Sequence, residues 1–283
     1  MIVFKKANDL QKWLDGQQKK GKKAGFVPTM GALHPGHISL IEAAKKENDS
    51  TLCSIFVNPT QFNDPKDFEK YPVTIEKDIF LLEAAGCDVL FLPSVTEMYP
   101  EGIAPKKEYA LGRLEEILEG KFRPGHYQGV CQVVERLLHI VEANHLYLGQ
   151  KDYQQCMVIT KLVELMGKKD KITIRICPTL RENDGLAMSS RNMRLNEEER
   201  KKATAIYRAL TYIKDNIQPG ETGKLSQNAI SQLTGAGFKV DYFEIADAAT
   251  LEKVTDWNGE QKLVALAAAF LNEIRLIDNR PLN

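Results

Sequence analysis

The sequence has no excess of charge of either sign, since 38 lysines and arginines are balanced by 38 aspartates and glutamates. A dedicated nucleic-acid-binding protein usually carries a basic excess, so this balance argues against a nucleic-acid partner. No apolar run approaches the roughly 20 residues that a membrane-spanning helix needs, and no membrane partner is expected. Residues 1–6 lack the order of charged, apolar and small residues typical of a signal peptide, so we expect a cytoplasmic protein.

Cysteine is scarce, and the spacing of the cysteines does not suit a metal site. The five cysteines include no CxxC pair, which gives a structural zinc site little support. Cys53 and Cys177 lie in apolar runs typical of buried strands, so we expect free, buried thiols in a reducing compartment. His34 and His37 have HxxH spacing, but there is no HExxH motif and no nearby third ligand. Metal binding by this pair is therefore kept only as an alternative.

The chain does have the length and apolar content of a globular protein with a substantial core: 283 residues, 43% hydrophobic and 27% charged. Up to about residue 178, continuous apolar runs alternate with amphipathic stretches. The expected strands are 24–27, 52–57, 89–92, 146–148 and 172–176. The expected helices are 36–46, 74–85, 130–141 and 153–166. This alternation predicts a parallel sheet covered by helices on both faces.

The character of the chain changes near Thr179, where a polar, glycine-containing stretch begins. Beyond it, helices are expected at 196–216 and 223–233, and strands at 240–245 and 263–270. We therefore predict an α/β domain over residues 1–178, with a Rossmann-like, doubly wound parallel sheet. A smaller C-terminal α+β domain over residues 179–283 is expected to cover the active site.

Residues 28–37, PTMGALHPGH, link the strand at 24–27 to a helix, where doubly wound folds bind ligands. Gly36 lets a ligand approach the backbone closely, and the helix N-terminus offers N–H groups and a positive dipole end. The imidazoles of His34 and His37 can donate to phosphate oxygens and meet charge that grows in a transition state. An HxGH motif in this position is typical of nucleotidyl transfer, although satisfied structural histidines are an alternative.

Residues 149–152, GQKD, stand where another expected strand gives way to a helix. Lys151 is suited to a phosphate in such a place, although most lysines are solvated surface groups. Asp152 is suited to capping the helix, and that structural role alone would explain it. Gln155 lies one helical turn beyond Lys151.

Residues 184–194, DGLAMSSRNMR, form a polar segment near the expected domain junction. Ser189 and Ser190 can cradle a phosphate with their hydroxyl and N–H groups, and Arg191 can bind two oxygens at once. The alternative is a polar linker with an N-cap cluster, because serine and asparagine favour such loops.

Neutral amides and one further turn complete the candidates. Asn58 and Gln61, in SIFVNPTQF, can act with Gln155 to orient a hydroxy acid without adding charge. Arg123 and His126, in RPGH, form either a phosphate contact or only a turn before a helix.

Taken together, these segments resemble the pantothenate synthetase (pantoate–β-alanine ligase) family of the cytidylyltransferase-like HxGH superfamily. The resemblance covers nearly the whole chain through PTMGALHPGH, SIFVNPTQF, RPGHYQGV, LGQKDYQQ, DGLAMSSRN and RLIDN, in that order. It implies an ATP-dependent ligase of pantothenate and coenzyme A biosynthesis. Pantoate would attack ATP to give pantoyl adenylate and pyrophosphate, and β-alanine would then displace AMP. No nucleophilic serine or cysteine with a paired base is evident, which fits a route without a covalent enzyme intermediate.

The resemblance also implies roles for individual residues, with His37 matching the family's proton donor. The implied catalytic residues are His34, His37, Lys151 and Arg191. The implied ATP-binding residues are Met30, Gly31, Ala32, Leu33, His34, Pro35, Gly36, His37, Gly149, Gln150, Lys151, Asp152, Leu180, Met188, Ser189, Ser190 and Arg191. The implied residues for pantoate and β-alanine are Asn58, Gln61, Arg123, His126 and Gln155.

Magnesium is expected with ATP, because the phosphates need a counter-ion. Asp78 is the candidate carboxylate, and the metal site is left open. The resemblance further implies a homodimer. Two alternatives stay open: another nucleotidyltransferase of the same fold, which has no need of the three amides or of a long second domain, and a non-catalytic nucleotide- or metal-binding protein that uses the HxxH pair.

Overall fold

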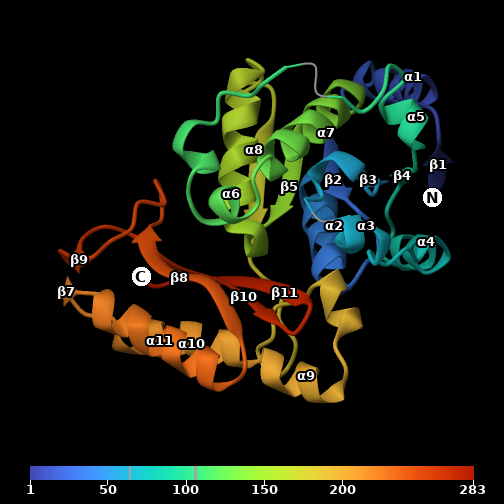
Figure 1. Cartoon of the computed structure of the whole chain (residues 1–283). Coiled ribbons are helices and arrows are strands. Elements are labelled where there is room, and N and C mark those ends of the chain that lie inside the picture. The colour runs from blue at the N-terminus through green and yellow to red at the C-terminus, as the bar shows by residue number, and fades with distance from the viewer. Residues whose placement is uncertain (64, 105–106) are drawn as a thin grey trace. The chain divides into compact units, whose positions relative to one another are not determined.

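The computed structural model describes residues 1–63, 65–104 and 107–283 (Figure 1). The chain divides into two compact units, which we describe one at a time. The N-terminal unit comprises Met1–Gln150 and Gln154–Pro178, and the C-terminal unit comprises Lys151–Tyr153 and Thr179–Asn283. No helix in the described parts of the chain has the length and hydrophobicity to span a bilayer.

The N-terminal unit is built on a six-stranded sheet in the order β1-β4-β3-β2-β5-β6, and its neighbouring strands are parallel. The strands are β1 (Ile2–Phe4), β2 (Ala24–Thr29), β3 (Ser50–Ile55), β4 (Val89–Phe91), β5 (His145–Gly149) and β6 (Thr173–Cys177). From β2, the strands β3, β4 and β1 follow on one side of the sheet, and β5 and β6 follow on the other, so the strand order reverses between β2 and β5. In doubly wound folds, ligands bind at the carboxyl ends of the strands that flank such a reversal. The predicted doubly wound parallel sheet is confirmed.

Helices cover both faces of this sheet. They are α1 (Ala7–Gln18), α2 (Pro35–Glu47), α3 (Pro65–Glu69), α4 (Ile75–Ala84), α5 (Val95–Met98), α6 (Leu118–Phe122), α7 (His126–Ile140) and α8 (Tyr153–Leu165), with 3-10 turns η1 (Pro59–Gln61), η2 (Gly112–Glu115) and η3 (Gln150–Asp152). Successive strand residues enter different cores: Phe26 and Leu52 join α1 and α7, while Val27 and Cys53 join α2 and α4. Burial on both faces explains why the inner strands β2 and β3 are continuous, mostly apolar runs.

Pro28 lies inside β2, whereas the sequence predicts a strand that ends before it. β2 pairs with β3 as far as Thr29, but with β5 only at Gly25 and Phe26. The Thr29 carbonyl accepts a hydrogen bond from the backbone N–H of Phe56, so the preceding residue faces the side of β5, where pairing has already ended. The missing N–H of Pro28 therefore costs no sheet hydrogen bond.

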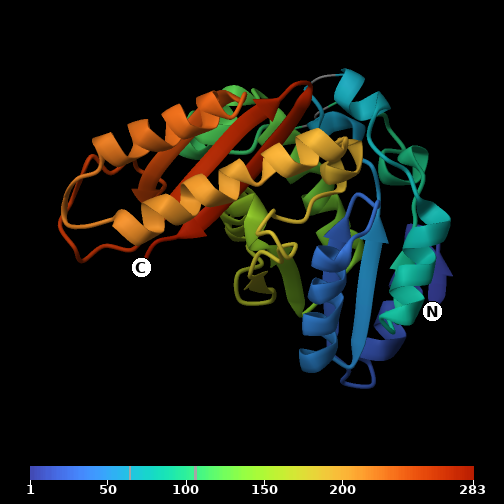
Figure 2. The same cartoon turned by 90° about the horizontal axis from the view of Figure 1, so that it is seen from below.

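The C-terminal unit contains an antiparallel sheet in the order β11-β10-β8, as expected of an α+β domain. Its main elements are α9 (Glu197–Ala203), α10 (Ala205–Asn216), α11 (Gly223–Gly235), β8 (Lys239–Asp247), β10 (Leu263–Leu271) and β11 (Ile274–Pro281). The turn η4 (Ser190–Arg194) and a ribbon of β7 (Gly220–Glu221) and β9 (Asp256–Trp257) complete it. Helices α10 and α11 lie along the sheet (Figure 2), where alternate small residues of β10, including Ala265 and Ala267, join their core. The single helix expected at 196–216 is instead α9 and α10, separated at Thr204.

Candidate active site

The turn between β2 and α2 has a backbone conformation that few residues adopt. Gly31 has a φ of +82° and Ala32 a φ of +48°, so two successive residues lie in the left-handed region. A Cβ atom on Gly31 would lie 3.0 Å from Ile55 Cγ2 and 3.1 Å from Asp78 Oδ2. A non-glycine residue in such a region costs about 1–3 kcal/mol and persists only where its surroundings hold it. The turn must therefore be fixed by neighbouring groups.

Asp78, on α4, binds this turn from the core side. Its carboxylate is fully buried and accepts hydrogen bonds from Ala32 N at 2.9 Å and from Leu33 N at 2.8 Å. The Thr74 hydroxyl donates to the same carboxylate at 3.0 Å. Asp78 was the candidate ligand for magnesium, but both of its oxygens are bound by protein donors. No group of three or more histidine, cysteine, aspartate or glutamate residues suited to a metal occurs in the described part of the chain.

His34 and His37 stand at the start of α2, with their ring centroids 4.0 Å apart. His34 is the N-cap and Pro35 the first helical residue, a position where the missing N–H of proline is not needed. The backbone N–H of His34 donates to His37 Nδ1 at 3.4 Å. Because Nδ1 accepts this bond, the proton of the neutral His37 ring lies on Nε2, which is then a donor. The helix N-terminus favours an anion at the same place.

Gln61, in η1, connects three of the sequence motifs within the N-terminal unit. Its Nε2 donates to Met30 Sδ at 3.0 Å, which joins η1 to the turn after β2. Its backbone carbonyl lies 2.8 Å from His126 Nδ1 and accepts from Arg123 Nη2 at 3.3 Å. Arg123 Nη1 lies 3.0 Å from His126 Nε2 and 3.7 Å from a Glu119 carboxylate oxygen. The RPGH segment therefore fixes the backbone of Gln61.

Asn58 and Gly129 hold η1 from the core side. Asn58 is buried: its Nδ2 donates to Gln61 Oε1 at 3.2 Å and to Gly129 O at 3.1 Å, and its Oδ1 accepts from the Tyr99 hydroxyl at 2.8 Å. A Cβ atom on Gly129 would lie 2.2 Å from Thr60 O, so only glycine lets α7 approach η1 this closely. Asn58 thus orients the Gln61 amide. The sequence did not reveal that Asn58 is the supporting residue of the two and Gln61 the one that it supports.

Gly149 is the last residue of β5 and Gln150 follows it, at the same edge of the sheet as the turn after β2. No atom lies within 4 Å of the place where a Cβ on Gly149 would be, so the backbone is open there. Of the two glutamines that follow, Gln154 is buried and its Oε1 accepts from Glu119 N at 3.0 Å. Gln155 is half-buried. The neighbouring amides thus differ, and Gln155 remains the candidate for a substrate.

Lys151 belongs to the C-terminal unit, together with Asp152 and Tyr153. Its carbonyl accepts a hydrogen bond from Asn279 Nδ2 at 2.8 Å. Its side chain is 17% exposed, and the ammonium lies 3.5 Å from a carboxylate oxygen of Asp152, whose side chain is 44% exposed. The Tyr153 hydroxyl donates to Ala248 O at 2.7 Å. This short segment is therefore held by Asn279 in β11 and by Ala248, which directly follows β8.

The other candidate ATP residues of the C-terminal unit lie on a hairpin and on the turn that follows it. The backbone N–H of Met188 donates to Leu180 O at 3.1 Å, which closes the hairpin. Arg200 stabilises the tip of the hairpin through two ion pairs. Its Nη2 lies 2.6 Å from Glu182 Oε2, and its Nη1 lies 2.8 Å from Asp184 Oδ2. The segment that the sequence presents as a polar loop is therefore ordered by its own hydrogen bonds and ion pairs.

Ser189, Ser190 and Arg191 come directly after this hairpin. Ser189 is the N-cap of η4, and its hydroxyl accepts from Arg191 N at 3.3 Å. Ser190 is buried, while Ser189 and Arg191 are half-buried. The C-terminal unit thus carries Lys151 and the SSR residues, whereas the N-terminal unit carries the histidine pair and the substrate amides.

A family model described as pantoate-beta-alanine ligase matches residues 2–281. The chain belongs to the pantoate–β-alanine ligase family. It is 45% identical to the pantothenate synthetase of Cytophaga hutchinsonii over 284 residues, 99% of this chain and 98% of that protein. It is 44% identical to that of Phocaeicola vulgatus over 283 residues, with 99% and 98% coverage. A match over the whole chain decides against the two alternatives that the sequence left open.

Solved structures of this ligase family have the same fold. The pantothenate synthetase of Thermus thermophilus superimposes with a TM-score of 0.91 at 40% identity, over 100% of this chain and 99% of that one. The pantoate-beta-alanine ligase of Francisella tularensis superimposes with a TM-score of 0.82 at 38% identity, over 100% and 98%. The latter structure is a complex with beta-gamma ATP and beta-alanine.

The thiols of this ligase are poor nucleophiles. All five cysteines are free, and four of them are buried. Burial is the main cause that raises the pKa of Cys87 to about 11 and that of Cys131 to about 12. Thiolates of Cys87 and Cys131 therefore hardly form near neutral pH. Cys177, which was expected to be buried, is half-buried instead, because most side chains of β6 are exposed or partly exposed.

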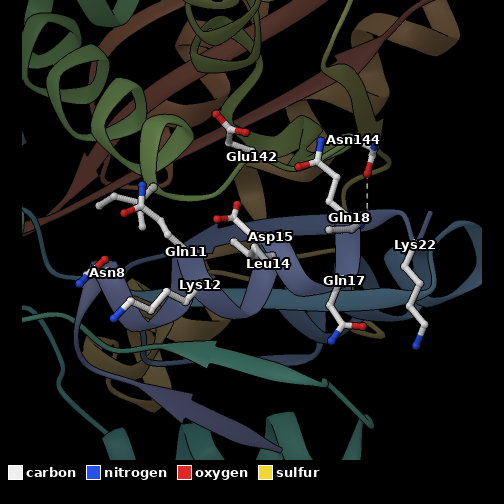
Figure 3. A pocket seen from close by; sticks show the side chains of 12 residues that line it. Asn8, Gln11, Lys12, Leu14, Asp15, Gln17, Gln18, Lys22, Glu142 and Asn144 are labelled. Carbon is white, nitrogen blue, oxygen red and sulfur yellow. Dashed lines mark hydrogen bonds between the residues drawn. The ribbon is translucent and has the colours of Figure 1, made fainter. Parts of the chain in front are cut away.

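The N-terminal unit also contains a polar hollow of about 300 Å³ (Figure 3). Its walls are side chains of α1, such as Asn8, Gln11 and Asp15, together with Asn144 just before β5. Because β2 and β5 begin here, the hollow lies at the amino edge of the parallel sheet. The turn after β2, with His34 and His37, lies at the carboxyl edge of this sheet, and no candidate residue lines the hollow.

Proposed function

We propose that this protein is an ATP-dependent ligase that joins pantoate to β-alanine, giving pantothenate, AMP and pyrophosphate. The observation that carries the proposal is the family match over residues 2–281. The N-terminal unit supports it, because the carboxyl edge of its sheet presents a histidine pair at a helix N-terminus and Gln61 beside it. The side-chain amide of Gln61 is bound by Met30 and Asn58, and its backbone carbonyl contacts His126. These groups suit a reaction between phosphate and a small hydroxy acid.

In the first step, an oxygen of the pantoate carboxylate attacks the α-phosphorus of ATP. The bond from this phosphorus to the bridging oxygen breaks, and pyrophosphate leaves with the electron pair. Negative charge grows on the phosphate oxygens, where we place His34 and His37 as donors. The tautomer set by the His34 N–H leaves His37 Nε2 able to donate, and preorganised donors of this kind stabilise the transition state.

In the second step, the amine of β-alanine attacks the acyl carbon of pantoyl adenylate. The bond from this carbon to the phosphate oxygen breaks, AMP leaves, and the amine gives up a proton. We propose that Gln61 and Gln155 orient pantoate, that Gln61 also serves the β-alanine site, and that Asn58, Arg123 and His126 act by fixing Gln61. No protein nucleophile is required, so positioning supplies the main catalytic effect.

We propose that Lys151 and Arg191 bind the phosphates of ATP, with Ser189 and Ser190 beside Arg191. Asp152 is assigned to the ribose, and the backbone of Leu180 to the adenine. Residues 30–37, Gly149, Gln150 and Met188 complete the ATP-binding set. The support is chemical and comes from the motifs: cations and hydroxyls that match phosphate oxygens, in the order in which the family carries them.

Magnesium would accompany ATP, since it binds mainly through phosphate oxygens and water and needs few protein ligands. The described residues do not fit a protein cage for the ion, because Asp78 is bound by backbone N–H groups. We also propose a homodimer in the cytoplasm. The family resemblance supports the dimer, which sedimentation would test, and the free thiols suit a reducing compartment.

The proposed function is tested by leaving out each substrate in turn. With ATP and pantoate alone, we expect exchange of labelled pyrophosphate into ATP. With β-alanine added, AMP and pantothenate should appear in equal amounts. Release of AMP without pantoate, or cleavage of ATP to ADP, would contradict the proposal.

A further inference from the structure

Asp278 and Asn279 lie at the end of the RLIDN segment, on β11. The sequence presents this segment as a motif without giving its residues a role. Both side chains are almost completely buried, with 5% and 2% of their surface exposed. Buried polar groups are nearly always hydrogen-bonded, so their partners show what the pair holds in place.

Asp278 holds Arg181, which follows the candidate adenine residue Leu180. Arg181 Nη1 donates to Asp278 Oδ2 at 2.6 Å and Nη2 donates to Oδ1 at 3.0 Å, the geometry of a bidentate ion pair. The same guanidinium donates to Gly185 O at 3.0 Å and to Asn279 O at 3.1 Å. One arginine therefore connects both the start and the tip of the 180–188 hairpin to β11.

Asn279 holds Lys151. Its Nδ2 donates to the Lys151 carbonyl at 2.8 Å, and its backbone N–H donates to Asp278 Oδ1 at 2.8 Å. The Asp278 carboxylate is thus shared between Arg181 and the residue that binds Lys151. Burial raises the pKa of Asp278, and Arg181, the Asn279 N–H and the Lys151 charge oppose that rise. Lys151 is therefore joined to this cluster by its carbonyl and by its charge.

The position of Lys151 in the chain shows why its hydrogen bond to Asn279 matters. Only Lys151–Tyr153 groups with the C-terminal unit here, whereas Gln150 before it and Gln154 after it belong to the N-terminal unit. A three-residue segment has few contacts of its own with which to choose a position. The bonds from Asn279 and from Tyr153 to Ala248 are therefore prominent among those that fix it.

We propose that Asp278 and Asn279 are positioning residues that hold Lys151 and the 180–188 hairpin as one preassembled phosphate- and adenine-binding element. The inference rests on the proposed function, since it assigns these residues to the ATP half of that reaction. Its physical basis is that a displacement of about 1 Å in a catalytic group can cost roughly a hundredfold in rate. Neither residue needs to touch the nucleotide for this effect.

The first test removes the amide donor. Asn279→Ala should lower kcat for pantoate-dependent pyrophosphate exchange by about tenfold or more, while KM for pantoate stays unchanged. Thr222→Val is the matched control, because the buried Thr222 hydroxyl donates to the Val254 carbonyl in the same unit. It should lower the melting temperature and leave the exchange rate within about twofold. Equal loss of rate in both variants would reduce Asn279 to a structural residue and overturn the proposal.

The decisive test is a double-mutant cycle with Lys151→Ala. If Asn279 acts through the Lys151 side chain, adding Asn279→Ala to Lys151→Ala should cause little further loss of rate. The same fold-loss in both backgrounds would overturn the inference. If Asn279→Ala does not fold, Asn279→Asp keeps the shape and places an acceptor opposite the Lys151 carbonyl, and the cycle is repeated with it. Wild-type protein without any pantoate-dependent exchange would instead overturn the proposed function.

Discussion

Each unit fixes its candidate site residues with a buried aspartate, and the two aspartates have different hydrogen-bond donors. In the N-terminal unit, Asp78 is bound by the backbone N–H groups of Ala32 and Leu33. In the C-terminal unit, Asp278 is bound by the guanidinium of Arg181. A carboxylate that accepts backbone N–H groups fixes the course of the chain, which suits a turn with left-handed residues. A carboxylate paired with arginine joins segments that are distant in the sequence, which suits a hairpin and a lysine.

The units also differ in how their charge responds to pH. All five histidines lie in the N-terminal unit, whereas the proposed cations of the C-terminal unit are Lys151 and Arg191. Among these histidines, burial lowers the pKa of His145, which lies at the start of β5. The comparison therefore predicts a response to mild acid in β5 that β10, in the C-terminal unit, does not share.

The largest effect is expected from His37→Ala, which removes a donor from the charge that grows on the phosphates. Adenylate formation should fall by about a hundredfold or more, with little change in melting temperature. Pantoate-dependent pyrophosphate exchange measures the rate, and His139→Ala, at an exposed position of α7, is the control. An unchanged rate would remove His37 from the mechanism and leave the C-terminal cations to account for the first step.

Asp78→Asn should have the next largest effect, because an amide oxygen can replace only one of the two carboxylate oxygens. One of the N–H groups of Ala32 and Leu33 would then face an NH₂ group, at a cost of about 1–3 kcal/mol. Displacement of the turn should slow adenylate formation about tenfold. The control is Asp88→Asn, since Asp88 accepts from Thr51 N at 2.7 Å at the amino edge of the same sheet. If the two variants slow exchange equally, Asp78 has no special connection to the site.

Gly129→Ala should separate substrate binding from the ATP half of the reaction. The added methyl would press on Thr60 O, displace η1 and Gln61, and destabilise the protein by about 1–3 kcal/mol. We expect KM for pantoate to rise severalfold while KM for ATP changes little. Gly16→Ala is the control: it lies in α1 with open space around it and should stabilise the protein by about 0.5–1 kcal/mol. A rise confined to KM for ATP would contradict the role of Gln61.

The smallest effect concerns His145, whose Nδ1 lies 2.6 Å from Asn48 Oδ1. Burial is the main cause that lowers its pKa, and the Arg175 charge adds to this. The folded state therefore favours the neutral ring, and its contribution to stability is complete above the unfolded pKa of about 6.5 and decreases as the pH falls below it. Hydrogen exchange is measured at about pH 7 and about pH 5.5 and corrected for the intrinsic rate. Protection of the β5 amides should be weaker at the lower pH, and protection of the β10 amides should be the same at both. His145→Gln should abolish the change, and an equal change in β10 would contradict the comparison.

The sequence was sufficient for the parallel sheet because strands buried on both faces are continuous apolar runs. It did not reveal β1, in which Ile2 and Val3 are exposed, or β11, whose charged residues obscure the strand pattern. From the sequence, Pro28 appeared to end β2, because a proline has no N–H for a neighbouring strand. The sequence does not show that pairing with β5 has already stopped at Phe26.

The candidate residues could be found from the sequence, but the positions of their supporting groups could not. Asn58 and Gln61 are equivalent amides in a motif, and only contacts with Tyr99 and Gly129 show that Asn58 is the buried one. Asp78 resembled a metal ligand until its N–H partners, 45 and 46 residues away, were visible. Such pairings depend on tertiary contacts that no local pattern contains.

The central claim is that pantoate is activated as an adenylate, and an oxygen label tests it most directly. Pantoate labelled with heavy oxygen in its carboxylate is converted with ATP and β-alanine, and the AMP is examined by mass spectrometry. Because the carboxylate oxygen that attacks the α-phosphorus stays on it when the amine displaces AMP, each AMP should carry one labelled oxygen. AMP without the label, formed alongside pantothenate, would contradict the account.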